Sequence, residues 1–70
     1  MNNYRSRIDL RADVKLGKPV IRGTKITVEH ILREMSEGMT SDELVLAYPN
    51  LEARDILAAL AYSADVMSNE

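Results

Sequence analysis

Two glycines and two lysines in the first half of the chain have the residue types of a phosphate-binding loop. Gly17 and Gly23 are six positions apart, with Lys18 and Lys25 beside them. A P-loop, however, needs Lys followed by Ser or Thr directly after its second glycine, and here Gly23 is followed by Thr24 and then Lys25. Because the order is reversed, these glycines are predicted to be turn residues, and no phosphate chemistry is expected.

The sequence also gives little support for catalysis or metal binding by histidine and carboxylate side chains. His30 is the only histidine and cysteine is absent, so neither a His pair for a metal ion nor a thiolate site can be built. His30 is predicted at the edge of a helix, four residues before Glu34. The carboxylates are accounted for by helix starts and solvent-facing positions. We therefore expect no catalytic residue, no metal site and no cofactor, and the protein is not expected to be an enzyme.

The net charge of -2 conceals a separation of charge along the chain. Residues 1–25 carry seven Lys or Arg and two Asp, whereas residues 26–70 carry two Arg and nine Asp or Glu. A basic segment on an acidic body predicts contact with nucleic acid, with an acidic protein surface or between the two halves, and a merely solvated arm is the simpler alternative. The candidate contact residues are Arg5, Arg7, Arg11, Lys18, Arg22, Lys25 and Arg54.

The elements that position these cations begin with an extended arm. Residues 1–6 are polar and are expected to fray. Apolar and charged residues alternate strictly over 7–16, which predicts a half-buried strand with Asp9 on its solvent side. Ala and Asp are poor strand residues, so a turn at 11–13 between two shorter extended pieces is the alternative.

A tight hairpin is predicted next. Residues 20–21 and 24–26 are β-prone runs separated by Arg22 and Gly23, and a glycine there can adopt positive φ. A lone two-stranded hairpin is marginal in water, so this one is expected to pack on helices or to pair with its copy in a second subunit. The residues expected to build such a dimer arm are Ile8, Leu10, Val20, Ile21 and Ile26.

Three helices are predicted after this arm, over 28–37, 41–47 and 53–66. Thr27 is expected to cap the first, and Thr40 with Glu43 has the spacing of a capping box for the second. The apolar stripe predicted for the third helix is Ile56, Leu57, Leu60, Ala61 and Ala64. The methionines predicted to fill the core are Met35, Met39 and Met67.

Composition indicates one small domain over residues 1–70, with a basic β-arm at 1–27 and a three-helix body at 28–66. The chain has no Cys, Trp or Phe, so its core must be built from smaller side chains without a disulfide. Small domains without such staples often associate, and a homodimer is expected. Neither a signal peptide nor a membrane-spanning run is recognisable, so we expect a cytoplasmic protein without membrane contact.

The short helix, turn and long helix at 41–66 have the proportions of a helix-turn-helix. In that motif the N-terminal residues of the second helix read the bases. Here those residues are Glu52, Ala53, Arg54 and Asp55, which offer a single cation. The predicted reading helix is therefore poorly suited to DNA, and the basic arm is the better candidate for phosphate contacts.

Several segments resemble a small bacterial family called domain of unknown function 433. The most specific is the Gly-Lys-Pro-Val-Ile-Arg-Gly-Thr run at 17–24, which continues to Val28. The other segments are 31–32, 37–40, 48–51, 55–56 and 58–62. Two positions depart from the family pattern: Lys25 stands where members usually have Arg, and Glu52 where Ser, Thr or Asp is frequent.

The resemblance implies a mainly α fold, a homeodomain-like three-helix bundle preceded by a short N-terminal β-hairpin arm, dimeric through that arm. It also implies a VapB-like antitoxin of a toxin-antitoxin system, paired with a PIN-like ribonuclease toxin. We therefore expect a dimeric antitoxin that binds such a ribonuclease. Binding of its own operator DNA is a separate, additional part of this hypothesis. The alternative is a dimerisation or adaptor module that does not bind DNA and whose basic arm docks on an acidic protein.

Overall fold

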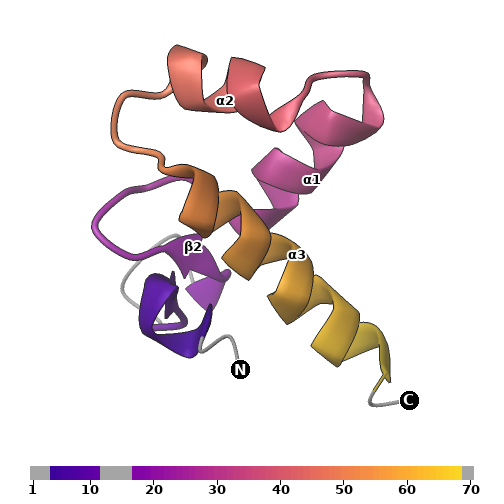
Figure 1. The fold of residues 1–70 in the computed structure, drawn as a ribbon. Coiled ribbons are helices and arrows are strands. Elements are labelled where there is room, and N and C mark those ends of the chain that lie inside the picture. Colours follow the sequence, from indigo (N-terminus) through magenta and orange to yellow (C-terminus); the bar gives the residue numbers. More distant parts are fainter. Residues whose placement is uncertain (1–3, 12–16, 69–70) are drawn as a thin grey trace.

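The computed structural model describes residues 4–11 and 17–68, which form six short elements. They are the 3-10 helix η1 (Tyr4–Arg7), the strands β1 (Ile8–Asp9) and β2 (Val20–Ile21), and the helices α1 (Val28–Ser36), α2 (Ser41–Ala47) and α3 (Ala53–Ser68). The fold is mainly helical, with a two-stranded antiparallel sheet near the N-terminus (Figure 1). α3 is the central element, because it contacts η1, β1, α1 and α2.

The sheet differs from the predicted hairpin. β2 pairs with β1, in the register Ile8 to Ile21 and Asp9 to Val20. The expected turn is confirmed, since the Thr24 amide donates to the Ile21 carbonyl at 3.0 Å and Gly23 has a φ of 83°. The return segment, however, forms only an isolated bridge between Val20 and Thr27 instead of a strand. β2 thus lies between two extended segments, and residues 12–16 of the strand predicted over 7–16 lie outside the described residues.

The N-terminal residues that were expected to fray include an ordered turn. Tyr4–Arg7 form η1, which packs against α3. The ring of Tyr4 meets the ring of Tyr62 edge to face, with 6.4 Å between centroids. This aromatic contact between distant parts of the chain stabilises η1 against α3.

The helix boundaries follow the predicted caps. The Thr27 hydroxyl accepts from the His30 amide at 3.0 Å, and the capping box of Thr40 and Glu43 is complete. α1 ends at Ser36, one residue before the predicted end, and α3 continues two residues further than predicted. Among the described residues, no helix has both the length and the apolar character needed to cross a membrane.

The core lies between the small sheet and the three helices. Met35 and Met39 pack partly buried against it, whereas Met67 is 68% exposed, so its predicted role as core filler was wrong. The buried apolar residues are Ile8, Val20, Ile21, Val28, Ile31, Leu44, Leu51, Ile56, Ala58 and Ala59.

α3 presents a different face to the core from the predicted stripe. Of the five residues in that stripe only Ile56 is buried, while Leu57 and Leu60 are 57% and 40% exposed. The buried side instead carries Asp55, Ala58 and Ala59 besides Ile56. The small alanines let neighbouring elements approach the helix closely, which the larger leucines would prevent.

Candidate functional site

Three of the seven cations predicted to contact a partner are held in ion pairs within the chain. Arg7 Nη1 lies 2.9 Å from Asp55 Oδ1, and Arg11 Nη2 lies 2.9 Å from Asp9 Oδ2. Lys18 Nζ lies 3.2 Å from Glu29 Oε1. These pairs neutralise much of the positive charge of the N-terminal segment, so the basic arm is weaker than its composition suggests.

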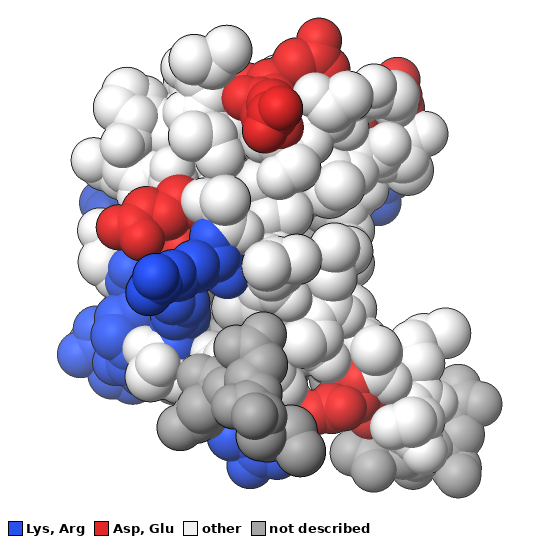
Figure 2. All heavy atoms as spheres, viewed as in Figure 1, with Lys and Arg blue, Asp and Glu red and all other residues white. Residues whose placement is uncertain are grey.

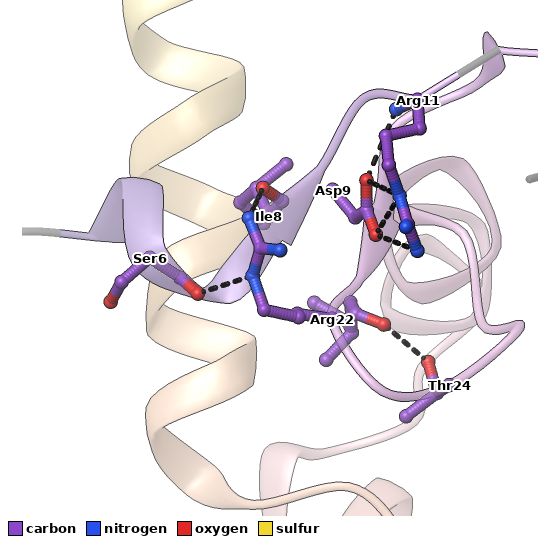
Figure 3. A network of polar contacts seen from close by, with 7 residues as sticks. Ser6, Ile8, Asp9, Arg11, Arg22 and Thr24 are labelled. Carbon is purple, nitrogen blue, oxygen red and sulfur yellow. Dashed lines mark hydrogen bonds and ion pairs between the residues drawn. The ribbon is translucent and has the colours of Figure 1, made fainter.

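Arg22 connects β2 to the N-terminal turn. Its Nε donates to the Ser6 carbonyl at 2.8 Å and its Nη2 to the Ile8 carbonyl at 3.3 Å (Figure 3). The Thr24 hydroxyl donates to the Ile21 carbonyl at 2.8 Å, which tightens the same turn. Arg22 is nevertheless exposed, and the contacts that Figure 3 draws for it are to carbonyls and not to a carboxylate. Its positive charge therefore stays at the surface.

Asp9 is buried, which corrects the prediction that it lies on the solvent side of a strand. Only 4% of the residue is exposed. The backbone amide and the guanidinium of Arg11 both donate to its carboxylate (Figure 3). These bonds hold the pKa of Asp9 below its usual value, and the positive charge of Arg22 adds to the effect. The alternation of apolar and charged residues could not reveal this burial. It depends on the hydrogen bonds from Arg11, which form because the chain bends after Asp9.

Asp9 is expected to make stability depend on pH in the acidic range. A carboxylate whose folded pKa is lowered contributes stability above its unfolded pKa, near 3.8, and that stability is lost as the pH falls through the folded pKa. Urea midpoints of the wild type and of Asp9→Asn should therefore differ at neutral pH and converge below that value. Glu29→Gln, which removes the exposed ion pairs with Lys18 and Arg33, is the matched control and should change the midpoint little. A difference that persists to the lowest pH would contradict this account.

Arg7 and Asp55 join η1 to the first turn of α3. Asp55 is 5% exposed, and its Oδ2 accepts from the Glu52 amide at 2.9 Å while its Oδ1 accepts from Arg7. Glu52 lies 3.5 Å from the same Arg7 nitrogen. The hydrogen bond that Arg7 donates to the Asp55 carboxylate raises the pKa of Arg7. The two carboxylates at the start of α3 thus contact Arg7 of the same chain. The cation at this helix start, Arg54, is exposed.

A second polar cluster joins α1 to the segment after α2. The Tyr48 hydroxyl donates to Glu34 Oε1 at 2.8 Å and lies 2.8 Å from His30 Nε2. The bond to the Glu34 carboxylate raises the pKa of Tyr48. A shallow cavity of about 290 Å³ lies beside this cluster and is lined by Lys25, Ile26, Thr27, His30 and Tyr48. Within 4–11 and 17–68, no group of three His, Cys, Asp or Glu side chains could hold a metal ion.

The residues predicted to form a dimer arm separate into two sets. Ile8, Val20 and Ile21 are between 0% and 6% exposed and pack in the core of this chain, so their side chains are not presented to a second subunit. Leu10 is 56% exposed, and Ile26 is partly buried against the core. Only these last two retain surface for a partner.

The sequence and the fold both match one family. A family described as a protein of unknown function (DUF433) matches residues 8–63. The chain belongs to this family. Its structure is similar to the crystal structure of a DUF433 member from Anabaena variabilis ATCC 29413, with a TM-score of 0.83 and 30% sequence identity. That similarity covers 90% of this chain and 62% of the other, so the present chain spans less than two thirds of its relative. No curated protein matches the sequence.

Besides Arg22, three cations of this DUF433 chain have no ion-pair partner within the part of the chain that the structure describes. Lys25 lies in the turn after β2, and Arg54 lies at the start of α3; both are exposed. The third is Arg5, whose guanidinium carbon lies 5.9 Å from the centroid of the Tyr4 ring. Figure 2 shows Lys and Arg side chains gathered on one side of the molecule, over η1 and β2.

A larger cavity of this DUF433 chain lies between its N-terminal elements and the end of α3. Its volume is about 320 Å³, and Leu10 forms part of its wall. The Tyr4 hydroxyl donates to Asp65 at the rim, and this bond raises the pKa of Tyr4. The lining residues are Tyr4, Arg5, Ile8, Leu10, Tyr62, Asp65 and Val66. The cavity thus combines an apolar wall with one cation and one carboxylate.

Proposed function

We propose that this DUF433 chain is an antitoxin-type protein-binding module whose basic side docks on the acidic surface of a PIN-like ribonuclease. The observation that carries the proposal is a set of exposed cations without a carboxylate partner among the described residues: Arg22 and Lys25 in the turn after β2, and Arg5 in η1. No described carboxylate of the same chain neutralises these charges, so they are available to complement a negative surface.

Protein docking is favoured over base reading because of how α3 begins. The carboxylates of Glu52 and Asp55 stand on either side of Arg54 in the sequence, and both lie close to Arg7. A homeodomain-like reading helix would present this first turn to DNA, where the exposed carboxylate of Glu52 would be repelled by phosphate, and Asp55 is buried and offers no contact. Operator DNA is therefore the second candidate, supported by the exposed Arg54 in a short-turn-long helix pair.

The proposal is tested by titrating the chain into a purified PIN-like ribonuclease from the same genome while cleavage of a fluorescent RNA is followed. We expect inhibition that reaches completion near one chain per ribonuclease. Lys25→Glu reverses an exposed charge in the turn and should raise the concentration for half-inhibition by about tenfold, since close charge reversals at an interface cost more than 1.4 kcal/mol. Arg33→Glu, on the exposed side of α1, is the matched control and should inhibit like the wild type.

Two results would overturn the proposal. One is an unchanged cleavage rate at equimolar chain and ribonuclease. The other is equal loss of inhibition in Lys25→Glu and Arg33→Glu, because this would indicate a general effect of charge and not a docking surface. A mobility-shift titration with the promoter DNA of the chain's own gene separates the second candidate: binding that weakens steeply as salt rises supports it, and no shift at about 50 mM salt removes it.

A further inference from the structure

The outer face of α3 is apolar along the length of the helix. Leu57 is 57% exposed, Leu60 40% and Met67 68%, and Ala53 and Ala64 are exposed as well. From residue 56 to 64 the helix carries no Lys, Arg, Asp or Glu. In the view of Figure 2, α3 lies in front and the surface along it is mostly white. A water-facing helix side would ordinarily carry charged residues, so this face is suited to contact with protein.

The exposed residues have the spacing of a helix-packing seam. Leu57 and Ala64 are seven positions apart, as are Leu60 and Met67, and Leu60 follows Leu57 by three. This is the a and d pattern of helices that pack side by side. The opposite side of α3 faces the core, and the seam residues Leu57, Leu60 and Met67 keep between 40% and 68% of their surface exposed.

We propose that this seam binds the same seam of a second copy, with the two α3 helices antiparallel about a twofold axis near Leu60 and Ala61. The order of large and small side chains supports this occupant. Reversal about that axis places Leu57 opposite Ala64 of the second copy, and Leu60 opposite Ala61. Each leucine then meets an alanine, which allows the two helices to interlock without voids or clashes. Such self-complementarity is what a twofold interface requires.

Charge at the two ends of the seam favours the antiparallel arrangement. Arg54 and Asp65 are both exposed and are eleven positions apart, which is about three helical turns, so they lie on the same flank of α3. In the antiparallel pair, Arg54 of each copy lies beside Asp65 of the other. Tyr4 uses Oδ2 of Asp65, which leaves Oδ1 to accept from the arginine. A parallel pair would leave Arg54 of one copy about three turns from Asp65 of the other, so the two could not pair.

The size of the seam sets the strength of the association. A 16-residue helix is about 24 Å long and about 10 Å wide, so it covers far less than the roughly 800 Å² per partner of a standard interface. The dimer is therefore expected to be weak, with dissociation in the micromolar range or above. This also means that monomer and dimer can be separated by dilution alone.

The test is sedimentation velocity of the intact chain from low micromolar to near-millimolar concentration. The wild type should shift from the monomer mass of 7.9 kDa toward twice that mass as concentration rises. Leu57→Glu buries a carboxylate in the seam and should raise the dissociation constant by about tenfold or more. Leu46→Glu, on an 84% exposed residue of α2, is the matched control and should dimerise like the wild type. Circular dichroism of each variant establishes that the helices are retained.

Charge reversal tests the orientation. Arg54→Asp should weaken the dimer, and adding Asp65→Arg to it should restore the wild-type constant, because the reciprocal pairs are re-formed with opposite polarity. The proposal is overturned by a monomer at every concentration, which would leave the seam to a different protein. It is equally overturned by a dimer that Leu57→Glu leaves intact, or by one that the double reversal fails to restore. None of these outcomes involves the ribonuclease, so they stand apart from the proposed function.

Discussion

Replacing Ile21 with alanine is expected to lower the free energy of unfolding by about 2–5 kcal/mol, because the side chain is fully buried and leaves a cavity. A chain of 70 residues has a total stability of roughly 4–10 kcal/mol. The variant should therefore be close to unfolding at ordinary temperature. Urea denaturation followed by circular dichroism measures the change.

Leu10→Ala is the control that separates a core role from a dimer-arm role. Both residues were predicted in the dimer arm, but Leu10 is 56% exposed, so its substitution should change stability by no more than about 0.5 kcal/mol. The loss in Ile21→Ala should also be the same at every protein concentration. A loss that grows on dilution would show that Ile21 is buried by a second subunit instead.

The second large effect is expected for Asp55→Ala. The substitution leaves the Glu52 amide without its acceptor and Arg7 without its nearest carboxylate, at a cost of about 1–3 kcal/mol for the lost buried acceptor. Because Arg7 belongs to η1, the contact between η1 and α3 should loosen as well. Hydrogen exchange at the amides of the first turn of α3 should accelerate more than exchange in α1, and a thermal melt gives the overall change.

Glu52→Ala is the matched control for Asp55→Ala. Its carboxylate is 70% exposed and lies 3.5 Å from Arg7, so it contributes a surface pair of about 0–1 kcal/mol. Equal destabilisation by both variants would contradict the assignment of Asp55 as the residue that fastens η1 to α3. Greater destabilisation by Glu52→Ala would contradict it more strongly.

The candidate site was predicted from sequence only in outline. The seven cations were recognised by their type, but the ion pairs that occupy Arg7, Arg11 and Lys18 were not. Arg7 and Asp55 are 48 positions apart, and nothing in their neighbouring residues indicates that they meet. The apolar residues of α3 were also recognised, but they were assigned to the core when most of them lie at the surface.

Local interactions determined the helices of this protein, and tertiary packing determined its surfaces. Thr27, Thr40 and Gly23 act on backbone groups within three residues, so the helix starts and the turn could be predicted from sequence alone. The choice between the two faces of α3 depends on which one fits against α1 and η1. Ala58 and Ala59 allow that close approach, and Arg7 satisfies the buried Asp55. The leucines that carry the larger hydrophobic area are therefore left outside, where a second copy is proposed to cover them.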